Sequence, residues 1–308
     1  MRYRAAVPAI AIVCVVAIAG CGLGAGGPTS GAVTLTVTRG FGTAPVGSVS
    51  EQSIPGSQTV MRMLERSFKV TTRYSGGFVE SIDGHAGSGS HLDWFYYVNG
   101  VQASLGASGT SVHKGDRIWW DLHDWTATDS VPAVVGSFPE PFVHGIGGRR
   151  YPVTIQCATD ADMACKRVTS ELKSTGVPVS SQAIGGGSGT DSIGVVVGTW
   201  NDVHGELLAE LIDHGPASSG VYARFSSGGS SLQLLNPDGN VVRTLGAGAG
   251  LIAATAQPST GPFWLITGTN VAGVSAAAAA LTPGRLRNHF ALAVQGQSDF
   301  PVPLEGAS

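Results

Sequence analysis

The sequence predicts two domains of different class: an α+β domain of the β-grasp type, then an α/β domain with a mostly parallel sheet. Three observations support this division. Residues 32–126 are mostly strand-like around one helical segment, residues 127–150 are rich in proline and glycine, and residues 151–308 alternate between strand-like and helical segments. Strands that alternate with helices are typical of a parallel sheet. A stretch rich in proline and glycine between two such regions is typical of a linker.

The N-terminal domain is predicted from strands of period 2 around a single helix. Residues 33–38 alternate apolar and threonine side chains, as a half-buried strand does. Residues 57–68 place apolar side chains at helical spacing, with Ser57 as the candidate N-cap. The Asn99-Gly100 pair is typical of a two-residue hairpin turn. Further strands are expected at 69–74, 77–84, 93–100 and 117–125.

The C-terminal domain is predicted from alternating strands and helices. Two of the helices follow a strand that ends in Gly-Thr, and Asn201 and Asn270 are their candidate N-caps. Such a helix start can bind an anion, although capping alone explains the pattern more simply. Helices are expected at 162–176, 201–215, 250–256 and 271–281. Strands are expected at 151–157, 192–200, 220–226, 262–270 and 290–296, with a hairpin at 231–245.

Residues 1–21 have the pattern of a bacterial lipoprotein signal. A basic start precedes an apolar run over residues 5–19, which is shorter than the roughly 20 residues of a bilayer-spanning helix. The small residues directly before Cys21 resemble a lipobox, in which the cysteine is lipidated; an ordinary secretory cleavage site is the alternative. Residues 22–31 are then a flexible tether. We expect a protein anchored by lipid to the outer face of the cell membrane.

Charge and cysteine usage narrow the possible partners. The chain has a net charge of −3 and no basic stripe, so nucleic acid is not an expected partner. Of its 4 cysteines, Cys14 lies in the signal and Cys21 is the lipidation site. Cys157 and Cys165 remain, and an even pair in an oxidising compartment is expected to form a disulfide. Their spacing, with no second cysteine pair nearby, is not that of a zinc site.

The aromatic run from Trp94 to Tyr97 raises the question of a ligand platform. Because side chains alternate along a strand, Trp94 and Tyr96 face one way and Phe95 and Tyr97 the other. Trp119 and Trp120 likewise point in opposite directions. One set of rings must pack on the predicted helix. The other set is covered by the second domain or the linker, or is open to a ligand.

Several motifs of the N-terminal domain occur in a particular order: TVMRMLERSF, GGFVESIDG, WFYYVNG, GAS and KGDRIWWDLHDW. Together they resemble the transcobalamin-like C-terminal domain family, over roughly residues 32–125. In the eukaryotic cobalamin carriers this module covers one face of the corrin ring, and a separate helical barrel, which has no counterpart here, holds the other. The C-terminal half resembles the extension of actinobacterial lipoproteins that carry the same module.

The resemblance implies cobalamin or another corrinoid as a ligand, with contacts from Trp94 and from the Gly106-Ala107-Ser108 loop. If the rings are open to solvent, Tyr96, Trp119 and Trp120 belong to the same surface, with the Asn99-Gly100 turn at its rim. Aromatic faces suit a macrocycle because they offer a large apolar area. Small loop residues suit it because they let backbone N–H groups approach closely.

No catalytic residue and no metal ligand is predicted, and an enzyme is less expected than a binding protein. The chain lacks the common nucleophile and zinc-hydrolase motifs, and no cysteine is left for nucleophilic chemistry. We expect an extracytoplasmic binding protein that captures a corrinoid or another flat, ring-bearing small molecule. The alternative is a non-catalytic module that binds an envelope or transporter protein and no small ligand. Two groups of polar residues are interpreted as solvated loop and strand faces: His85, His91 and Asp93, and Asp121, His123 and Asp124.

Overall fold

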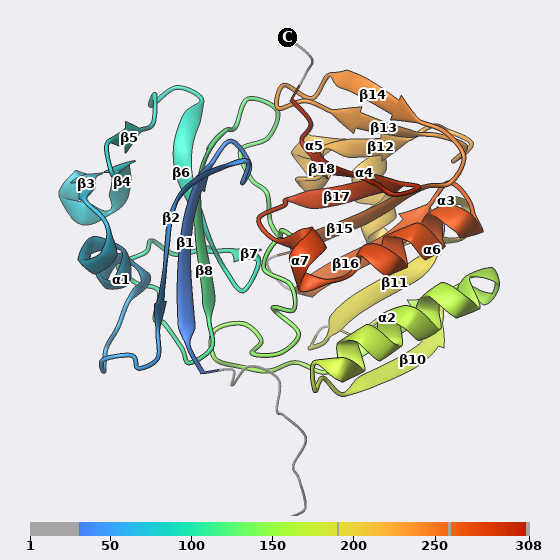
Figure 1. Ribbon diagram of the computed structural model, residues 1–308, viewed down its shortest axis with the longest axis horizontal. Coiled ribbons are helices and arrows are strands. Elements are labelled where there is room, and N and C mark those ends of the chain that lie inside the picture. Colours follow the sequence, from blue (N-terminus) through green and yellow to red (C-terminus); the bar gives the residue numbers. More distant parts are fainter. Residues whose placement is uncertain (1–30, 190, 258–259, 306–308) are drawn as a thin grey trace, which may run out of the picture.

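The computed structural model describes residues 31–189, 191–257 and 260–305. Two lobes lie side by side (Figure 1), which we call the N-terminal lobe (31–126) and the C-terminal lobe (151–305). A connecting segment (127–150) runs between them. The predicted signal and its Cys21 lie outside the described residues, as does almost all of the tether. No helix in the described part of the chain is long and apolar enough to cross a membrane.

Five strands form the main sheet of the N-terminal lobe: β1 (Val33–Arg39), β2 (Ala44–Glu51), β6 (Leu92–Val98), β7 (Val101–Gln102) and β8 (Arg117–Asp124). Their order is β2-β1-β8-β6-β7, in which β1 and β8 are parallel and the other neighbours antiparallel. Asn99 and Gly100 join β6 to β7 with φ values of 55° and 78°. This is the positive-φ pair that the predicted hairpin turn requires.

Helix α1 (Val60–Ser67) packs on one face of this sheet and begins after Thr59. The Thr59 hydroxyl accepts from the N–H of Arg62, so Thr59 is the N-cap and the prediction of Ser57 was wrong. Strand β2 was not predicted, because its proline and glycine are disfavoured in strands. The predicted strands at 69–74 and 77–84 form a separate small sheet: β3 (Val70–Arg73), β4 (Phe78–Ile82) and β5 (His85–Ala86).

Seven strands form the sheet of the C-terminal lobe: β9 (Val153–Cys157), β10 (Val179–Ala183), β11 (Ile193–Thr199), β15 (Ala249–Gln257), β16 (Thr260–Gly268), β17 (Ala291–Gln295) and β18 (Ser298–Val302). Their order is β10-β9-β11-β16-β15-β17-β18. Strands β10, β9, β11 and β16 are parallel to one another. The remaining strands, β15, β17 and β18, pair antiparallel with their neighbours. The sheet is therefore mixed and not mostly parallel.

Helices α2 (Asp162–Ser174) and α6 (Val271–Ala280) cover one face of this sheet. Asn270 caps α6 as predicted, accepting from the N–H of Gly273 at 3.0 Å. The single helix predicted at 201–215 is instead broken near Gly205, and Thr199, not Asn201, is the N-cap of its first part. The other face carries α3 (Trp200–Val203), α4 (Leu207–Asp213), α5 (Pro216–Ser219) and a sheet of β12 (Ala223–Phe225), β13 (Leu232–Leu235) and β14 (Val241–Leu245).

Residues 250–256 belong to strand β15 and do not form the predicted helix. The small residues of this segment, alanines that favour a helix and Gly250, are needed because α6 packs closely on the strand. A Cβ atom at Gly250 would lie 2.2 Å from the carbonyl oxygen of Gly273, and one at Gly273 would lie 2.1 Å from that of Ala249. The small residues therefore serve backbone contact between α6 and the sheet.

We expect Gly273→Ala to lower the free energy of unfolding by about 1–3 kcal/mol, because the added methyl group pushes α6 away from β15. Urea denaturation followed by circular dichroism measures the change. Gly284→Ala is the matched control, since no heavy atom lies within 4 Å of a Cβ there; its stability should stay within about 0.5 kcal/mol of the parent. Equal stability of both variants would contradict the close packing.

The predicted disulfide is present: Cys157 at the end of β9 is bonded to Cys165 in α2. The bridge joins the sheet to the helix that follows it in sequence.

The connecting segment is largely buried, unlike an exposed linker. Its apolar side chains enter the core of the C-terminal lobe and the apolar cluster between the lobes; Val134 and Val135 are 0% exposed. Beside it, Trp119 of the N-terminal lobe packs edge-to-face on Phe290 of the C-terminal lobe, with ring centroids 5.2 Å apart. Phe41 contacts the same ring at 5.0 Å. The two lobes therefore share an apolar core at their junction, and each lobe also has a core of its own.

Candidate functional site

The aromatic strand β6 is buried on both of its faces. Trp94 and Tyr96 are 6% and 9% exposed and pack, with Trp120, in the core against α1. Tyr97 and Trp119, on the other face, are 0% and 3% exposed and pack against the C-terminal lobe. Of the two alternatives, packing between the lobes is therefore the one present, and the described residues form no open ring platform, because the helix covers one set of rings and the second lobe covers the other.

The Gly106-Ala107-Ser108 loop lies over the end of Tyr96. Gly106 and Ser108 are exposed, whereas Ala107 is buried. The Tyr96 hydroxyl donates to the carbonyl oxygen of Leu105, so it accepts from Thr110 Oγ1 at 2.7 Å. Burial raises the pKa of Tyr96, and the bond to Thr110 opposes that rise. Tyr96 thus holds the two ends of the loop together as a protonated hydroxyl.

A groove of about 800 Å³ opens beside this loop, between the two lobes. The N-terminal lobe contributes residues 101–105, in which Leu105 is 64% exposed. The connecting segment contributes Pro132 and Ile146. The C-terminal lobe contributes Tyr151 and the ends of β15 and β16.

The groove lining is mostly neutral. It is lined by apolar side chains such as Leu105 and Ile146, together with the amide of Gln102 and several serine hydroxyls. Asp191 is the single carboxylate among the described lining residues; it lies 3.3 Å from Arg149 and is 76% exposed. Such a lining suits a ligand with apolar faces and neutral hydrogen-bonding groups.

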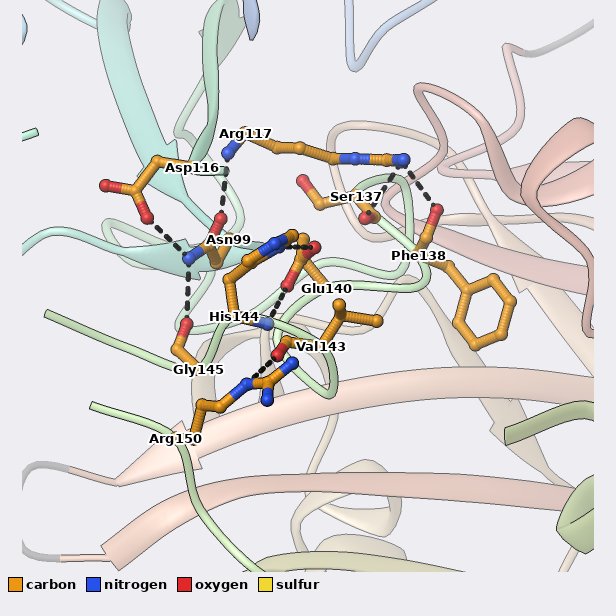
Figure 2. A network of polar contacts seen from close by, with 10 residues as sticks. All are labelled: Asn99, Asp116, Arg117, Ser137, Phe138, Glu140, Val143, His144, Gly145 and Arg150. Atoms are coloured by element: carbon orange, nitrogen blue, oxygen red, sulfur yellow. Dashed lines mark hydrogen bonds and ion pairs between the residues drawn. The ribbon is translucent and has the colours of Figure 1, made fainter. Parts of the chain in front are cut away.

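One wall of the groove is fixed by the buried Asn99-Gly100 turn. Asn99 is 0% exposed, and its side-chain amide donates to Asp116 and to the carbonyl oxygen of Gly145, both at 2.8 Å (Figure 2). Its side-chain oxygen accepts from the N–H of Arg117 at 2.8 Å. The turn is therefore buried and does not form the rim of an open ring surface, the position expected for it if the rings were open to solvent. It anchors the connecting segment next to Ile146.

The same network continues along the connecting segment (Figure 2). Arg117 donates to the carbonyl oxygens of Ser137 and Phe138, at 3.3 and 2.8 Å. The buried Glu140 accepts from the backbone N–H of His144 at 2.8 Å and bonds its Nδ1 at 2.6 Å. Burial lowers the pKa of Arg117, and the nearby Glu140 opposes that shift. These contacts make this groove wall a folded structure rather than a loose loop.

A second buried polar group lies away from the groove, at the core shared by the lobes. The carboxylate of Asp121 is 0% exposed and accepts from the N–H groups of Phe41 and Gly42, each at 2.9 Å. It also accepts from the Thr38 hydroxyl and lies 3.0 Å from Nδ1 of His123. Phe95 stacks on the His123 ring at 4.4 Å. The pair shares one strand face, as predicted, but that face is buried and not solvated.

The other polar group of the sequence prediction does not converge on one point. His91 Nε2 lies 3.6 Å from Asp124, and Asp93 accepts from the indole N–H of Trp125 at 2.9 Å. His85 instead uses its backbone carbonyl to accept from the indole of Trp94. Within the described ranges, no three His, Cys, Asp or Glu side chains lie close enough to hold a metal ion.

Sequence reasoning missed most of the groove. Gln102, Ile146 and Tyr151 carry no motif, and they meet Ala256 only because three distant segments fold together. The available signal was the short stretch after the hairpin turn, residues 101–105, which leads into the predicted Gly106-Ala107-Ser108 loop.

Comparison with known proteins gives one family and a partial structural similarity. Residues 57–124, less than a quarter of the chain, match a family described as a domain of unknown function, DUF4430, which is associated with transcobalamin-like domains. No curated protein matches the chain. Among solved structures it is similar to the crystal structure of "a putative metal binding protein" from Ruminococcus gnavus. That similarity has 20% identity and a TM-score of 0.25, over 30% of this chain and 97% of the other.

Proposed function

We propose that this chain is a non-enzymatic binding protein, held at the outer face of the cell membrane by lipid on Cys21. Its N-terminal lobe is a β-grasp module. The groove between the lobes binds a flat, ring-bearing ligand such as a corrinoid. The observation that carries this proposal is the groove of about 800 Å³ beside the loop at residues 105–110.

The size and chemistry of the groove support a small ligand. Its volume lies within the roughly 300–1,000 Å³ typical of ligand sites. Its apolar and neutral polar lining matches a large ring with amide or hydroxyl substituents. The exposed Gly106 at its border lets backbone groups come close to such a ring, because glycine has no side chain. The DUF4430 match over residues 57–124 includes this loop.

Calorimetry of the purified full chain against a panel of corrinoids tests the ligand. We expect binding that Ser104→Trp weakens by roughly tenfold or more, about 1.4 kcal/mol, because the indole fills the groove from its exposed rim. Ser227→Trp, at an exposed turn that does not line the groove, is the matched control and should bind like the parent. Absence of binding across the panel would reject the corrinoid.

The anchor is tested separately by metabolic labelling with a palmitate analogue. The parent chain should be labelled and Cys21→Ala should not. Label that persists in the variant would reject lipidation at this cysteine.

A second candidate function is a protein-binding module of the cell envelope, with no small ligand. The burial of β6 on both faces favours it, because the rings then serve packing between the lobes and leave no macrocycle surface. Under this hypothesis none of the corrinoids binds, and Ser104→Trp instead weakens the association with an envelope or transporter protein.

A further inference from the structure

Strand β10 is an outer strand whose free edge lacks the usual protection against pairing. Natural edge strands are blunted by charges, prolines, bulges or a covering segment. The residues of β10, Val-Ser-Ser-Gln-Ala, include neither charge nor proline, and its pairing with β9 runs without a register shift. Residues 180–183 are exposed.

Other edges of the described sheets do carry such features. At the opposite edge of the same sheet, β18 contains Asp299 and Pro301. In the N-terminal lobe β2 contains Pro45, and β7 is covered because its Gln102 N–H donates to Pro132. The edge strand β14 contains Arg243. Compared with these edge strands, β10 is the one whose backbone groups are open to pairing with another strand.

A groove of about 780 Å³ lies directly beside this edge, under helix α2. Ser181 and Ala183 line it from the strand, and Thr169, Ser170 and Lys173 line it from the helix. In Figure 1, α2 and β10 lie together at one border of the C-terminal lobe. There is therefore room for the side chains of one more strand between the β10 edge and α2.

We propose that the occupant is a second copy of this chain, whose β10 pairs antiparallel with the first across a two-fold axis at Ser181. The two sheets then form one continuous sheet, and the unpaired backbone groups of both edges are satisfied. The two-fold pairing places Ser181 opposite Ser181, Ser180 opposite Gln182 and Val179 opposite Ala183, so polar residues meet polar ones and apolar residues meet apolar ones.

The charges along α2 fit this symmetry. The helix runs opposite to β10, so a two-fold axis at Ser181 places the two α2 helices antiparallel on the same face. Asp162 at the start of one helix then faces Lys173 at the end of the other, and both residues border the groove. The helix centre presents the small hydroxyls of Thr169 and Ser170, which allow close approach. Asp162 is already paired with Lys166 of its own helix, at 2.6 Å, so Lys173 of the other copy would be a second cation beside the same carboxylate.

Cross-linking in cells that produce the full chain tests the geometry. Ser181→Cys places two cysteines directly opposite each other, at the Cα separation that a disulfide spans. We expect a disulfide-linked dimer on a non-reducing gel. Thr244→Cys, at an exposed position of the β14 edge, is the matched control and should stay monomeric. Absence of the dimer in Ser181→Cys, or equal cross-linking of both variants, would overturn the proposal.

Light scattering of the purified full chain in detergent measures the oligomeric state without cross-links. The parent should have twice the mass of one chain, and Ser181→Lys should have the mass of one chain because two ammonium groups then face each other. Thr244→Lys should remain dimeric, and circular dichroism should show the same fold in all three. A monomeric parent, or a Ser181→Lys dimer, would overturn the proposal. Neither result bears on the groove between the lobes.

Discussion

Trp94→Ala is expected to lower the free energy of unfolding by about 3–5 kcal/mol, the usual loss for a large buried aromatic side chain. The ring is 6% exposed and packs in the core that α1 completes. Its indole N–H also donates to the carbonyl oxygen of His85 at 3.0 Å, and that bond is lost with the ring. Denaturation in urea, followed by circular dichroism, measures the effect.

Trp94→Phe is the control that separates packing from hydrogen bonding, because it keeps an aromatic ring and removes the N–H. Its loss should be smaller than that of the alanine variant. Ligand affinity of the folded Trp94→Phe protein should equal that of the parent, since the ring does not reach the groove. Reduced affinity with unchanged stability would instead assign Trp94 to the ligand, as the sequence first suggested.

Asp121→Ala is expected to cost about 3–5 kcal/mol, because it removes one partner from a buried, charged hydrogen-bond cluster. The N–H groups of Phe41 and Gly42 would lose their acceptor. The hydroxyl of Thr38, which also accepts from the indole of Trp119 at 2.7 Å, would lose its own acceptor. The substitution therefore removes the side-chain hydrogen bonds that hold the β1–β2 turn on β8. Urea denaturation of the purified chain gives the size of the loss.

Asp124→Ala is the matched control for Asp121→Ala. It removes a carboxylate three residues further along β8, where the side chain is partly exposed and accepts from the N–H of Thr126. We expect a loss of no more than about 1 kcal/mol, because water replaces a lost partner at an exposed site. A loss as large as that of Asp121→Ala would show that burial of the carboxylate is not the cause.

Local patterns predicted the individual elements better than their assembly. The alternation in residues 33–38, the Asn99-Gly100 turn and the Asn270 cap depend on neighbours in sequence, and the structure contains each of them. The prediction of a helix at 250–256 failed because its alanines favour a helix, whereas here small residues are needed in a strand on which a helix packs closely. That choice depends on α6, which is distant in sequence from β15.

The candidate site was harder to predict for the same reason. Trp94 and Trp119 carry a strong aromatic signal, but a sequence does not show whether a ring faces solvent or a second lobe. Burial by Phe290, far along the chain, settled that question for Trp119. The groove depends on Ile146 and Tyr151, whose types are ordinary and whose meeting follows from how the connecting segment folds.

The core shared by the lobes also determines how a ligand would enter the groove. A hinge motion that separated the lobes would expose Phe41, Trp119 and Phe290 together. Each such ring buries about 150–250 Å², and exposing that area costs about 4–6 kcal/mol for each of the three rings at about 25 cal/mol per Å². An opening and closing motion of the two lobes around a ligand is therefore unfavourable. A ligand would enter a preformed groove from its open side, and its association rate would be set by diffusion and local side-chain rearrangement.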